Sequence, residues 1–381
     1  MLRTNMVRIA FLVGLLLQTS TDLLSQRARS SAYAPLPAPV LVIGGEGGPD
    51  YEFVTIAAAH RLSTGDIAIA DWRTPTVRVY DTGGRLIQRL GREGAGPGEF
   101  RGVHDLFLAG DTLIAFDSNL LRLTRYLATG ALVGTQPVQT AADDGRVHVV
   151  GHLSSGRWVV ATPHAPNWTH GPGIYRDTLR VGTVAPSSTG PVRWVGNFPG
   201  ATFFAYMPGQ DKTRWAVGWA FFAATSVVGA FRDTIMVGDT ATPELLYILA
   251  DGRLVRRLTI PLDGPLDLTQ HRQAARDEAL AQAGPYTNKA YVQASYDAPR
   301  STPRYRDFVV ASDGHLWVRL FEESPASPVP YLVLSSAGIV RARVSLPPRS
   351  RVLTVQTPWI LYVLRDADDV ERLSVVRWEI P

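Results

Sequence analysis

Apolar and polar residues alternate in short runs along most of this chain, and glycine-containing turns separate the runs. Near the amino end, Asp66–Asp71 and Val77–Asp81 are two such runs, and the turn Thr82–Gly84 leads into a third at Arg85–Leu90. Alternation over about four to eight residues, rich in β-branched and aromatic side chains, is typical of half-buried strands. The pattern predicts short antiparallel strands joined by tight turns, and therefore an all-β fold.

This group of strands is repeated along the chain. The glycine-rich stretch Ile43–Phe53 returns 47 positions later as Leu90–Phe100, with its Gly, Glu and Phe residues aligned. Three further residues have counterparts 46 positions later: Asp71 in Asp117, Tyr80 in Tyr126 and Gly84 in Gly130. A self-match at about 40 to 50 residues, with four strands in each unit, is typical of a β-propeller blade.

Later units diverge but keep the same turns. Their strand patterns fall at 147–195, 219–258, 308–344 and 352–378. The last unit has only three strands, and Val40–Gly44 is the counterpart of Ile87–Gly91, the outer strand of the first unit. The sequence therefore predicts a six-bladed β-propeller of four-stranded antiparallel blades over residues 35–381. Its amino-terminal strand is expected to complete the last blade and close the ring.

Two segments do not fit the blade pattern and are expected to be insertions, at 163–175 and 263–304. The second contains the one convincing helix of the chain. Thr269 suits the N-cap position, Gln270–Ala283 are helix formers, and Gly284-Pro285 ends the pattern. We expect a propeller with one helical insertion.

The first 34 residues differ from the rest. Arg3 and Arg8 flank a short apolar run, Ile9–Leu17, which polar residues follow. This order fits a secretory signal peptide, and the run is shorter than the roughly 20 residues that span a bilayer. We expect residues 1–34 to be a signal peptide, or an uncleaved membrane anchor, plus a linker. The protein is then exported, to the periplasm or outside the cell.

Composition narrows the possible partners and chemistry. The net charge is only +4, and the chain has no cysteine. Arginines are dispersed rather than clustered, which argues against a nucleic-acid partner. Without cysteine there is no disulfide, thiolate metal site or cysteine nucleophile. We expect a monomer that contacts a membrane only through its amino-terminal segment, if that segment is not cleaved.

Several motifs resemble those of a known family. A glycine-rich stretch ending Gly96-Pro97-Gly98-Glu99-Phe100 precedes a strand, and the run Asp111–Asp117 follows. This arrangement resembles the NHL-repeat class of six-bladed propellers. Asp313–Val318 also resembles a hairpin of exported bacterial propellers of uncharacterised function. The resemblance implies the fold over most of residues 40–381, but such folds host binding modules, lyases and lactonases, so it implies no particular chemistry.

Signatures of catalysis are absent from the sequence. The glycine-rich stretch has neither phosphate-loop spacing, and G-x-S-x-G does not occur. His148 and His152 on one strand would stand about 13 Å apart, too far to share an ion unless Gly151 breaks the strand. No cofactor is evident. A zinc or calcium ion in the central channel is left open, with Asp105 as a candidate calcium ligand.

The geometry of a propeller favours binding at the mouth of its central channel, where innermost strands and inserted loops meet. The candidate ligand-binding residues are His60, His104, Asp105, His148, Arg306 and Asp307 on inner strands, with Trp168 and Trp215 in loops. No catalytic residue is identified. The sequence therefore predicts an exported binding module for a small ligand or protein partner in the cell envelope. The alternative is a channel-centred, metal-assisted lyase or hydrolase.

Overall fold

The structure is a computed structural model. It describes residues 32–45, 47–138, 147–164, 173–186, 191–206, 216–262, 269–281, 283–284, 288–297, 303–322, 324 and 326–381. Most of the expected signal peptide, together with Trp168 and Trp215, lies outside the described residues.

Six antiparallel sheets follow one another along the chain, as the repeat predicts. The first is β3 (Ile56–Arg61), β4 (Ile67–Asp71), β5 (Val77–Tyr80) and β6 (Leu86–Leu90). The second is β9 (Asp105–Ala109), β10 (Thr112–Asp117), β11 (Arg122–Leu127) and β12 (Leu132–Pro137). The third is β13 (His148–His152), β14 (Trp158–His164), β15 (Gly173–Val184), β16 (Arg193–Tyr206) and β17 (Ala216–Trp219).

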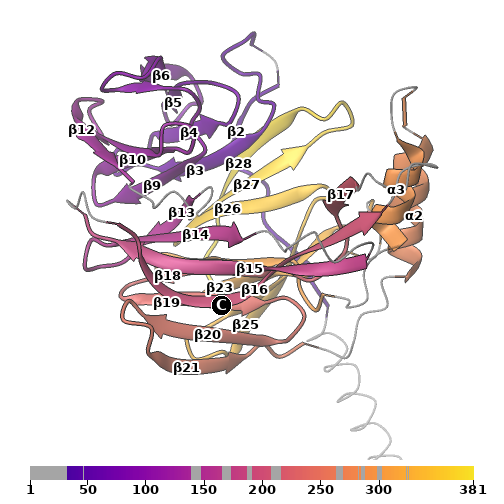
Figure 1. Ribbon diagram of the computed structural model, residues 1–381. Helices are drawn as coiled ribbons and strands as arrows, with labels where there is room; N and C mark the ends of the chain where they lie inside the picture. Colours follow the sequence, from indigo (N-terminus) through magenta and orange to yellow (C-terminus); the bar gives the residue numbers. More distant parts are fainter. Residues whose placement is uncertain are drawn as a thin grey trace, which may run out of the picture.

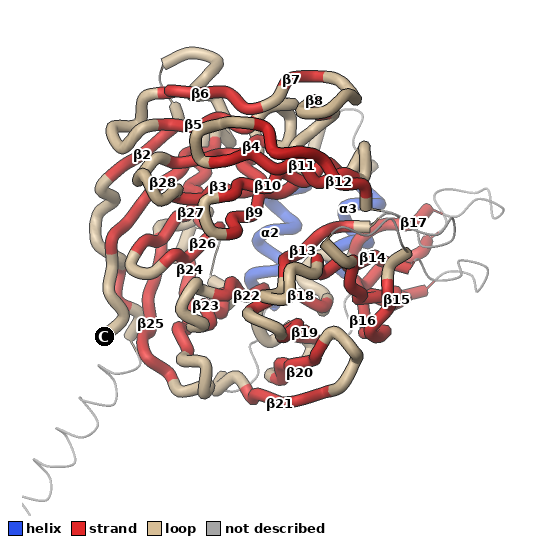
Figure 2. Tube along the Cα trace, turned by 90° about the vertical axis from the view of Figure 1, so that its left-hand side faces the viewer, coloured by secondary structure: helices blue, strands red, loops and turns tan. Residues whose placement is uncertain are grey.

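The remaining sheets complete the set. The fourth is β18 (Ser226–Phe231), β19 (Thr234–Asp239), β20 (Glu244–Leu249) and β21 (Leu254–Thr259). The fifth is β22 (Asp307–Val310), β23 (Leu316–Arg319), β24 (Val329–Leu334) and β25 (Val340–Leu346). The sixth is β26 (Ser350–Gln356), β27 (Trp359–Arg365) and β28 (Glu371–Arg377). Figure 2 shows the first strand of each sheet near a common centre.

The amino-terminal residues add strands to the last two sheets. β1 (Ala34–Pro35) pairs in parallel with β25, and β2 (Leu41–Ile43) pairs antiparallel with β28, placing Leu41 opposite Val375. The expected pairing of Val40–Gly44 with the last blade is therefore present, whereas β1 was not expected. The sixth sheet also contacts the first directly, because Thr354 Oγ1 donates to the Ala59 carbonyl at 2.8 Å.

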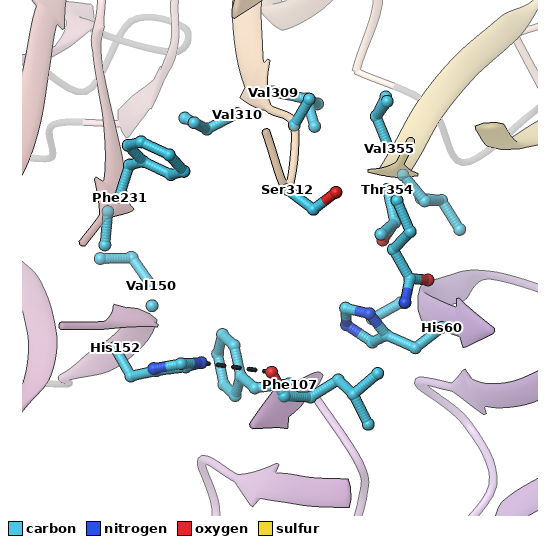
Figure 3. Close-up of a pocket in the computed structure, with 18 of the residues that line it drawn as sticks. His60, Phe107, Val150, His152, Phe231, Val309, Val310, Ser312, Thr354 and Val355 are labelled. Carbon is cyan, nitrogen blue, oxygen red and sulfur yellow. Dashed lines mark hydrogen bonds between the residues drawn. The ribbon is translucent and has the colours of Figure 1, made fainter. Parts of the chain in front are cut away.

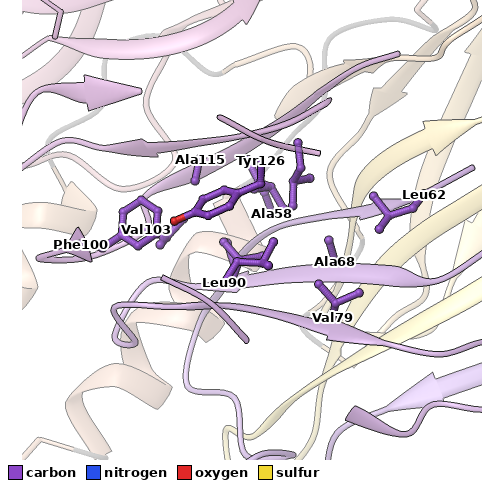
Figure 4. Close-up of a cluster of buried hydrophobic side chains, with 13 residues drawn as sticks. Ala58, Leu62, Ala68, Val79, Leu90, Phe100, Val103, Ala115 and Tyr126 are labelled. Carbon is purple, nitrogen blue, oxygen red and sulfur yellow. The ribbon is translucent and has the colours of Figure 1, made fainter. Parts of the chain in front are cut away.

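The core lies between the blades. A buried apolar cluster separates each pair of neighbouring sheets, including the sixth and the first. Figure 4 shows the cluster between the first two sheets, where Leu90, Phe100 and Tyr126 meet. Faces of strands that alternate apolar and polar residues pack in this way when sheets stack side by side around a ring.

The glycine-rich stretch at Leu90–Phe100 joins the first blade to the second. Within it β7 (Arg92–Glu93) pairs in parallel with β8 (Glu99–Phe100). Tyr126 Oη donates to the Gly98 carbonyl at 3.2 Å, and Tyr80 Oη donates to the Asp50 carbonyl at 2.5 Å in the earlier copy. The two copies of the turn are thus held by equivalent tyrosines.

Two helices lie on one face of the ring, α2 (Thr269–Ala281) and α3 (Lys289–Asp297) (Figures 1 and 2). They connect β21 to β22, so they lie at the end where the innermost strands begin. The expected helix at Gln270–Ala283 corresponds to α2, and α3 is an additional helix that the sequence pattern did not indicate. Within the described residues, no helix is long and apolar enough to cross a membrane.

One strand assignment was wrong. Trp219–Thr225 had been expected to begin the fourth blade, but Trp219 ends β17, which pairs with β16 in the third sheet. The fourth sheet begins instead at Ser226. The third sheet has five strands because β15 and β16 extend to 12 and 14 residues, and their long hairpin offers a further edge for β17 to pair with.

Candidate functional site

A cavity of about 660 Å³ occupies the centre of the ring. All six innermost strands contribute to its wall (Figure 3). Much of that wall is apolar, formed by residues such as Phe107, Val150, Phe231, Val309 and Leu353. A cavity of this size, apolar with a few polar groups, is typical of a small-molecule site.

His60 on β3 supplies a polar group with a fixed tautomer. Its Nε2 donates to the Leu106 carbonyl at 2.8 Å, which leaves Nδ1 as an acceptor. Nδ1 is buried and has no hydrogen-bond partner among the described residues. Burial is the main cause that lowers the pKa of His60 to about 4; the hydrogen bond to Leu106 offsets part of this effect, and the nearby His152 adds a smaller lowering. The imidazole is therefore neutral at neutral pH, with a lone pair available to a ligand.

Asp105 begins β9 and contributes a carboxyl group to the same cavity. Its Oδ1 accepts a hydrogen bond from the Leu106 N–H at 2.8 Å. Burial raises the pKa of Asp105 to about 7, and that hydrogen bond only partly offsets the rise. The carboxyl group is therefore poised to exchange a proton near neutral pH. Leu106 holds both polar side chains, Asp105 through its N–H and His60 through its carbonyl.

His152 also lines the cavity, although the sequence did not single it out as a ligand-binding residue. Its Nε2 donates to the Leu108 carbonyl at 3.3 Å, so β9 accepts a histidine from each neighbouring innermost strand. The pairing of β13 with β14 shifts register between Val149 and Gly151. That bulge separates the two histidines of β13, leaving His148 exposed while His152 faces the cavity.

His104, another predicted residue, does not line the cavity wall. Its Nδ1 accepts a hydrogen bond from the Ser118 N–H at 3.1 Å, and its ring packs edge-on against Trp72 at 6.0 Å. His104 thus supports the turn after β10 rather than the channel.

Arg306 and Asp307 lie away from the central cavity, at the start of β22. Arg306 pairs with Glu322 at 2.8 Å and stacks over Phe321 at 4.8 Å, while Asp307 pairs with Arg319. Of the six predicted residues that the structure describes, it thus brings only His60 and Asp105 together in the cavity. Arg306 helps to line a second, arginine-rich pocket.

Other polar residues of the cavity wall are engaged in holding the ring together. Gln356 Nε2 donates to the Arg61 carbonyl at 2.9 Å, and its Oε1 accepts from the Arg61 N–H at 2.8 Å. Thr354 likewise donates to the Ala59 carbonyl. These bonds tie β26 to β3, so His60 Nδ1 and the Asp105 carboxyl are the better candidates for contacting a ligand.

A metal centre finds no support in the described residues. In that part of the chain, no three His, Asp or Glu side chains are grouped closely enough to hold an ion. Asp105 and His60 alone do not provide the four or more ligands that protein-bound zinc or calcium ordinarily takes, even with one ligand from water.

Comparison with known proteins agrees on the fold. A family model, DUF5128, described as a 6-bladed beta-propeller, matches residues 52–151, which span the first two blades and the start of the third. It supports the six-bladed fold and does not place the chain in the NHL-repeat class. A comparison with curated protein sequences gives no match.

Solved structures with the same architecture share little sequence with this chain. A member of the DUF4221 family from Bacteroides vulgatus has a TM-score of 0.52 at 10% identity, covering 91% of this chain and 98% of that one. A Bacteroides fragilis protein described as a candidate exported protein has a TM-score of 0.50 at 10% identity, covering 91% and 99%. A gluconolactonase of Xanthomonas campestris has a TM-score of 0.44 at 11% identity, covering 91% and 98%. At such identities the likeness concerns the fold alone.

Proposed function

We propose that this protein is an exported, monomeric binding module that takes up a small, largely apolar molecule in its central cavity. The observation that carries the proposal is the buried Nδ1 of His60, an acceptor that has no hydrogen-bond partner in the part of the chain that the structure describes. A buried polar atom without a partner costs stability, and a ligand that donates a hydrogen bond there would recover it. The apolar wall around it accounts for the rest of the affinity.

The chemistry of the two polar groups defines the ligand. His60 requires a ligand that donates a hydrogen bond, because its pKa of about 4 keeps Nδ1 unprotonated. Asp105, with a pKa of about 7, donates a hydrogen bond when protonated and accepts one when ionised. A ring or chain that carries one hydroxyl or N–H group satisfies both conditions.

A matched pair of probes tests this assignment. We expect 2-naphthol, which has a hydroxyl donor, to bind more tightly than 2-methoxynaphthalene, which has none. One net hydrogen bond corresponds to a difference of roughly threefold to tenfold in Kd. His60→Leu should abolish the difference, as measured by naphthalene fluorescence titration. His148→Leu is the matched control, because His148 lies on the exposed side of β13.

Two outcomes count against the binding site. Equal affinities of the two probes for the wild-type protein would remove the role of His60 as an acceptor. An equal loss in the His60→Leu and His148→Leu variants would show that the probes bind elsewhere.

A catalytic role is the second candidate, and Asp105 is the observation that favours it. A carboxyl group with a pKa near 7 suits a general acid or base at neutral pH. In that case Asp105→Asn abolishes turnover while leaving the affinity for 2-naphthol within about threefold of the wild type. The metal-assisted form of this alternative lacks a ligand set in the described residues.

We infer export from residues 1–34, whose basic flank and short apolar run fit a signal peptide. We expect the full-length chain to reach the cell envelope and a chain that begins at Tyr33 to stay in the cytoplasm. Fractionation of expressing cells measures this directly, and an equal distribution of the two chains would contradict it.

A further inference from the structure

A second pocket, of about 300 Å³, lies between the fifth and sixth blades and shares no lining residue with the central cavity. It sits at the end of the ring where β22 and β26 begin. Its wall holds five arginines: Arg306, Arg319, Arg349, Arg351 and Arg365. The proposed function makes no use of this pocket.

The side of the pocket nearest the first blade is built around one buried carboxylate. Glu371 is 2% exposed and accepts a hydrogen bond from the Ile56 N–H at 2.6 Å. Arg365 bonds Glu371 Oε1 at 2.8 Å, and Arg351 bonds Oε2 at 3.3 Å. Two guanidinium groups thus share one carboxylate, so these arginines and Glu371 together carry a net charge of +1.

The opposite side has its own ion pairs. Arg306 pairs with Glu322 at 2.8 Å, and Arg319 pairs with Asp307. At the rim Arg349 pairs with the exposed Asp369. Five guanidinium groups are therefore matched by four carboxylates, which leaves one positive charge uncompensated. Burial lowers the pKa of Arg306 and Arg351, and the neighbouring Arg319 lowers both further, so the arginines repel one another.

Within the described ranges, four buried polar atoms of lining residues have no hydrogen-bond partner: Arg306 Nε, Arg319 Nε, Ser350 Oγ and Glu322 Oε2. Ser350 is only 4% exposed, and the other three atoms are buried as well. Buried polar atoms are usually paired, so four unpaired ones around a single pocket call for an occupant. The two N–H groups and the hydroxyl can donate to it, and the carboxylate oxygen can accept from it.

We propose that this pocket binds a small oxyanion that carries a hydrogen-bond donor of its own, as a hydrogen phosphate or a hydroxycarboxylate does. The excess of guanidinium groups attracts the negative charge, and their N–H groups match the oxygens of a phosphate or carboxylate. Glu322 Oε2 selects for the donor, because an anion without one would meet a bare carboxylate oxygen.

Two pairs of anions separate this proposal from simple charge attraction. Inorganic phosphate at pH 7 carries a hydroxyl group, and sulfate does not. Glycolate carries one, and acetate does not. We expect phosphate to bind about tenfold more tightly than sulfate, measured by isothermal titration calorimetry at constant ionic strength. In the same way, we expect glycolate to bind more tightly than acetate. The comparison of phosphate with glycolate then distinguishes a phosphate site from a carboxylate site, because the anion that fits the pocket better binds more tightly.

Variants locate the site. Arg365→Gln should weaken phosphate binding by about tenfold or more, because it removes a charged donor. Ser350→Ala should weaken it by roughly threefold without disturbing any ion pair. Glu322→Gln should narrow the preference for phosphate over sulfate, because an amide can donate to either anion. Arg257→Gln is the matched control, since Arg257 pairs with Glu244 on the exposed surface of the fourth blade.

The outcomes are distinct. Equal affinity for phosphate and sulfate, or an Arg257→Gln variant as weak as Arg365→Gln, would overturn the proposal. If Arg365→Gln fails to fold, Ser350→Ala and Glu322→Gln still decide the matter. His60→Leu should leave phosphate binding unchanged, because His60 is not part of this pocket. The two sites are therefore tested independently: a failure of 2-naphthol to bind in the central cavity would not count against the phosphate site, and a failure of phosphate to bind would not count against the central cavity.

Discussion

At the scale of single residues, the central cavity favours the neutral forms of its two main polar groups. His60 and Asp105 face the cavity, but protein surrounds them, so burial lowers the pKa of the histidine to about 4 and raises that of the carboxyl to about 7. Each shift is a statement about stability, because the unfolded chain titrates at the ordinary values. The two residues act in opposite directions as the pH changes.

The signs follow from which state binds more protons. Between about pH 4 and 7 the folded state keeps the proton of Asp105 that the unfolded state has lost, so stability falls as the pH rises. Between about pH 4 and 6.5 the unfolded state protonates His60 and the folded state does not, so stability rises with pH. In the wild-type protein these two contributions largely cancel below pH 6.5.

Asp105→Asn should therefore uncover the contribution of His60. We expect the free energy of unfolding of this variant to rise from pH 4 to 6.5 by roughly 1 kcal/mol per pH unit. His60→Leu should show the opposite slope, falling up to pH 7. Urea denaturation at a series of pH values measures both, and curves parallel to that of the wild type would refute the assignment.

Some of these residues are predictable from sequence and others are not. His60 and Asp105 follow from their position on innermost strands, because the repeat places those strands. The position of His152 depends on a bulge between Val149 and Gly151, because of which His152, and not the predicted His148, faces the channel. The arginine-rich pocket joins residues from five strands and three loops, so no local pattern in the sequence indicates it.

At the scale of elements, the turns that join blades are held by their neighbours in a repeated way. Phe53 and Phe100 are buried at equivalent positions, and each packs near the tyrosine that bonds its turn. In the earlier copy Arg78 pairs with the buried Asp71 at 3.1 Å and donates to the Asp50 carbonyl at 2.8 Å. The Gly, Tyr and Phe residues that recur in the sequence are thus explained by the same turn structure, which occurs before the first blade and again before the second.

Gly91, in the turn that joins the first two blades, should be far less tolerant of a side chain than Gly110, a left-handed glycine in a hairpin of the second blade. Its φ is +80°, and a Cβ atom would lie 2.3 Å from the ring of Phe100. Gly110 has φ +60° with no heavy atom within 4 Å of such a Cβ. We expect Gly91→Ala to cost about 3 kcal/mol or more and Gly110→Ala about 1 kcal/mol, by urea denaturation. Similar costs would show that Phe100 moves aside freely.

Elements outside the repeat were harder to predict. α3 has nine residues and mixes aromatic with polar side chains, so its helical period is weak. Its Tyr291 packs against Phe204 at 5.4 Å, which indicates that contact with β16 stabilises the helix. Trp219 reads as the start of an inner strand, but it stacks on Phe203 at 4.3 Å in an extra outer strand. In both cases a long-range contact decides a structure that the local sequence does not specify.

At the scale of the whole molecule, the six sheets share one centre, and the last packs against the first. Ile43 of β2 is 1% exposed, in a cluster that also contains Ile69 of the first blade and Leu361 of the sixth. The amino-terminal strand therefore contributes to the contact between those blades as well as to its own sheet. We infer that it closes the ring.

Removal of Val40–Gly44 tests that inference. The deletion exposes the edge of β28 and leaves a gap where Ile43 packed, so we expect a loss of several kcal/mol in the unfolding of the whole ring. Val42→Ala is the matched control, because Val42 lies on the same strand and is 51% exposed. Unfolding followed by tryptophan fluorescence measures both, and a truncated protein of unchanged stability would refute closure by β2.

The pairing of β2 with β28 also has a consequence for how the protein is made. A ribosome produces Leu41 well before Val375, yet the two lie opposite each other in one sheet. Until β28 has been synthesised, β2 has no partner, and the nascent chain carries an unpaired strand edge that can pair with other chains. A chaperone that shields the amino-terminal strand during translation would protect the step on which the finished ring depends.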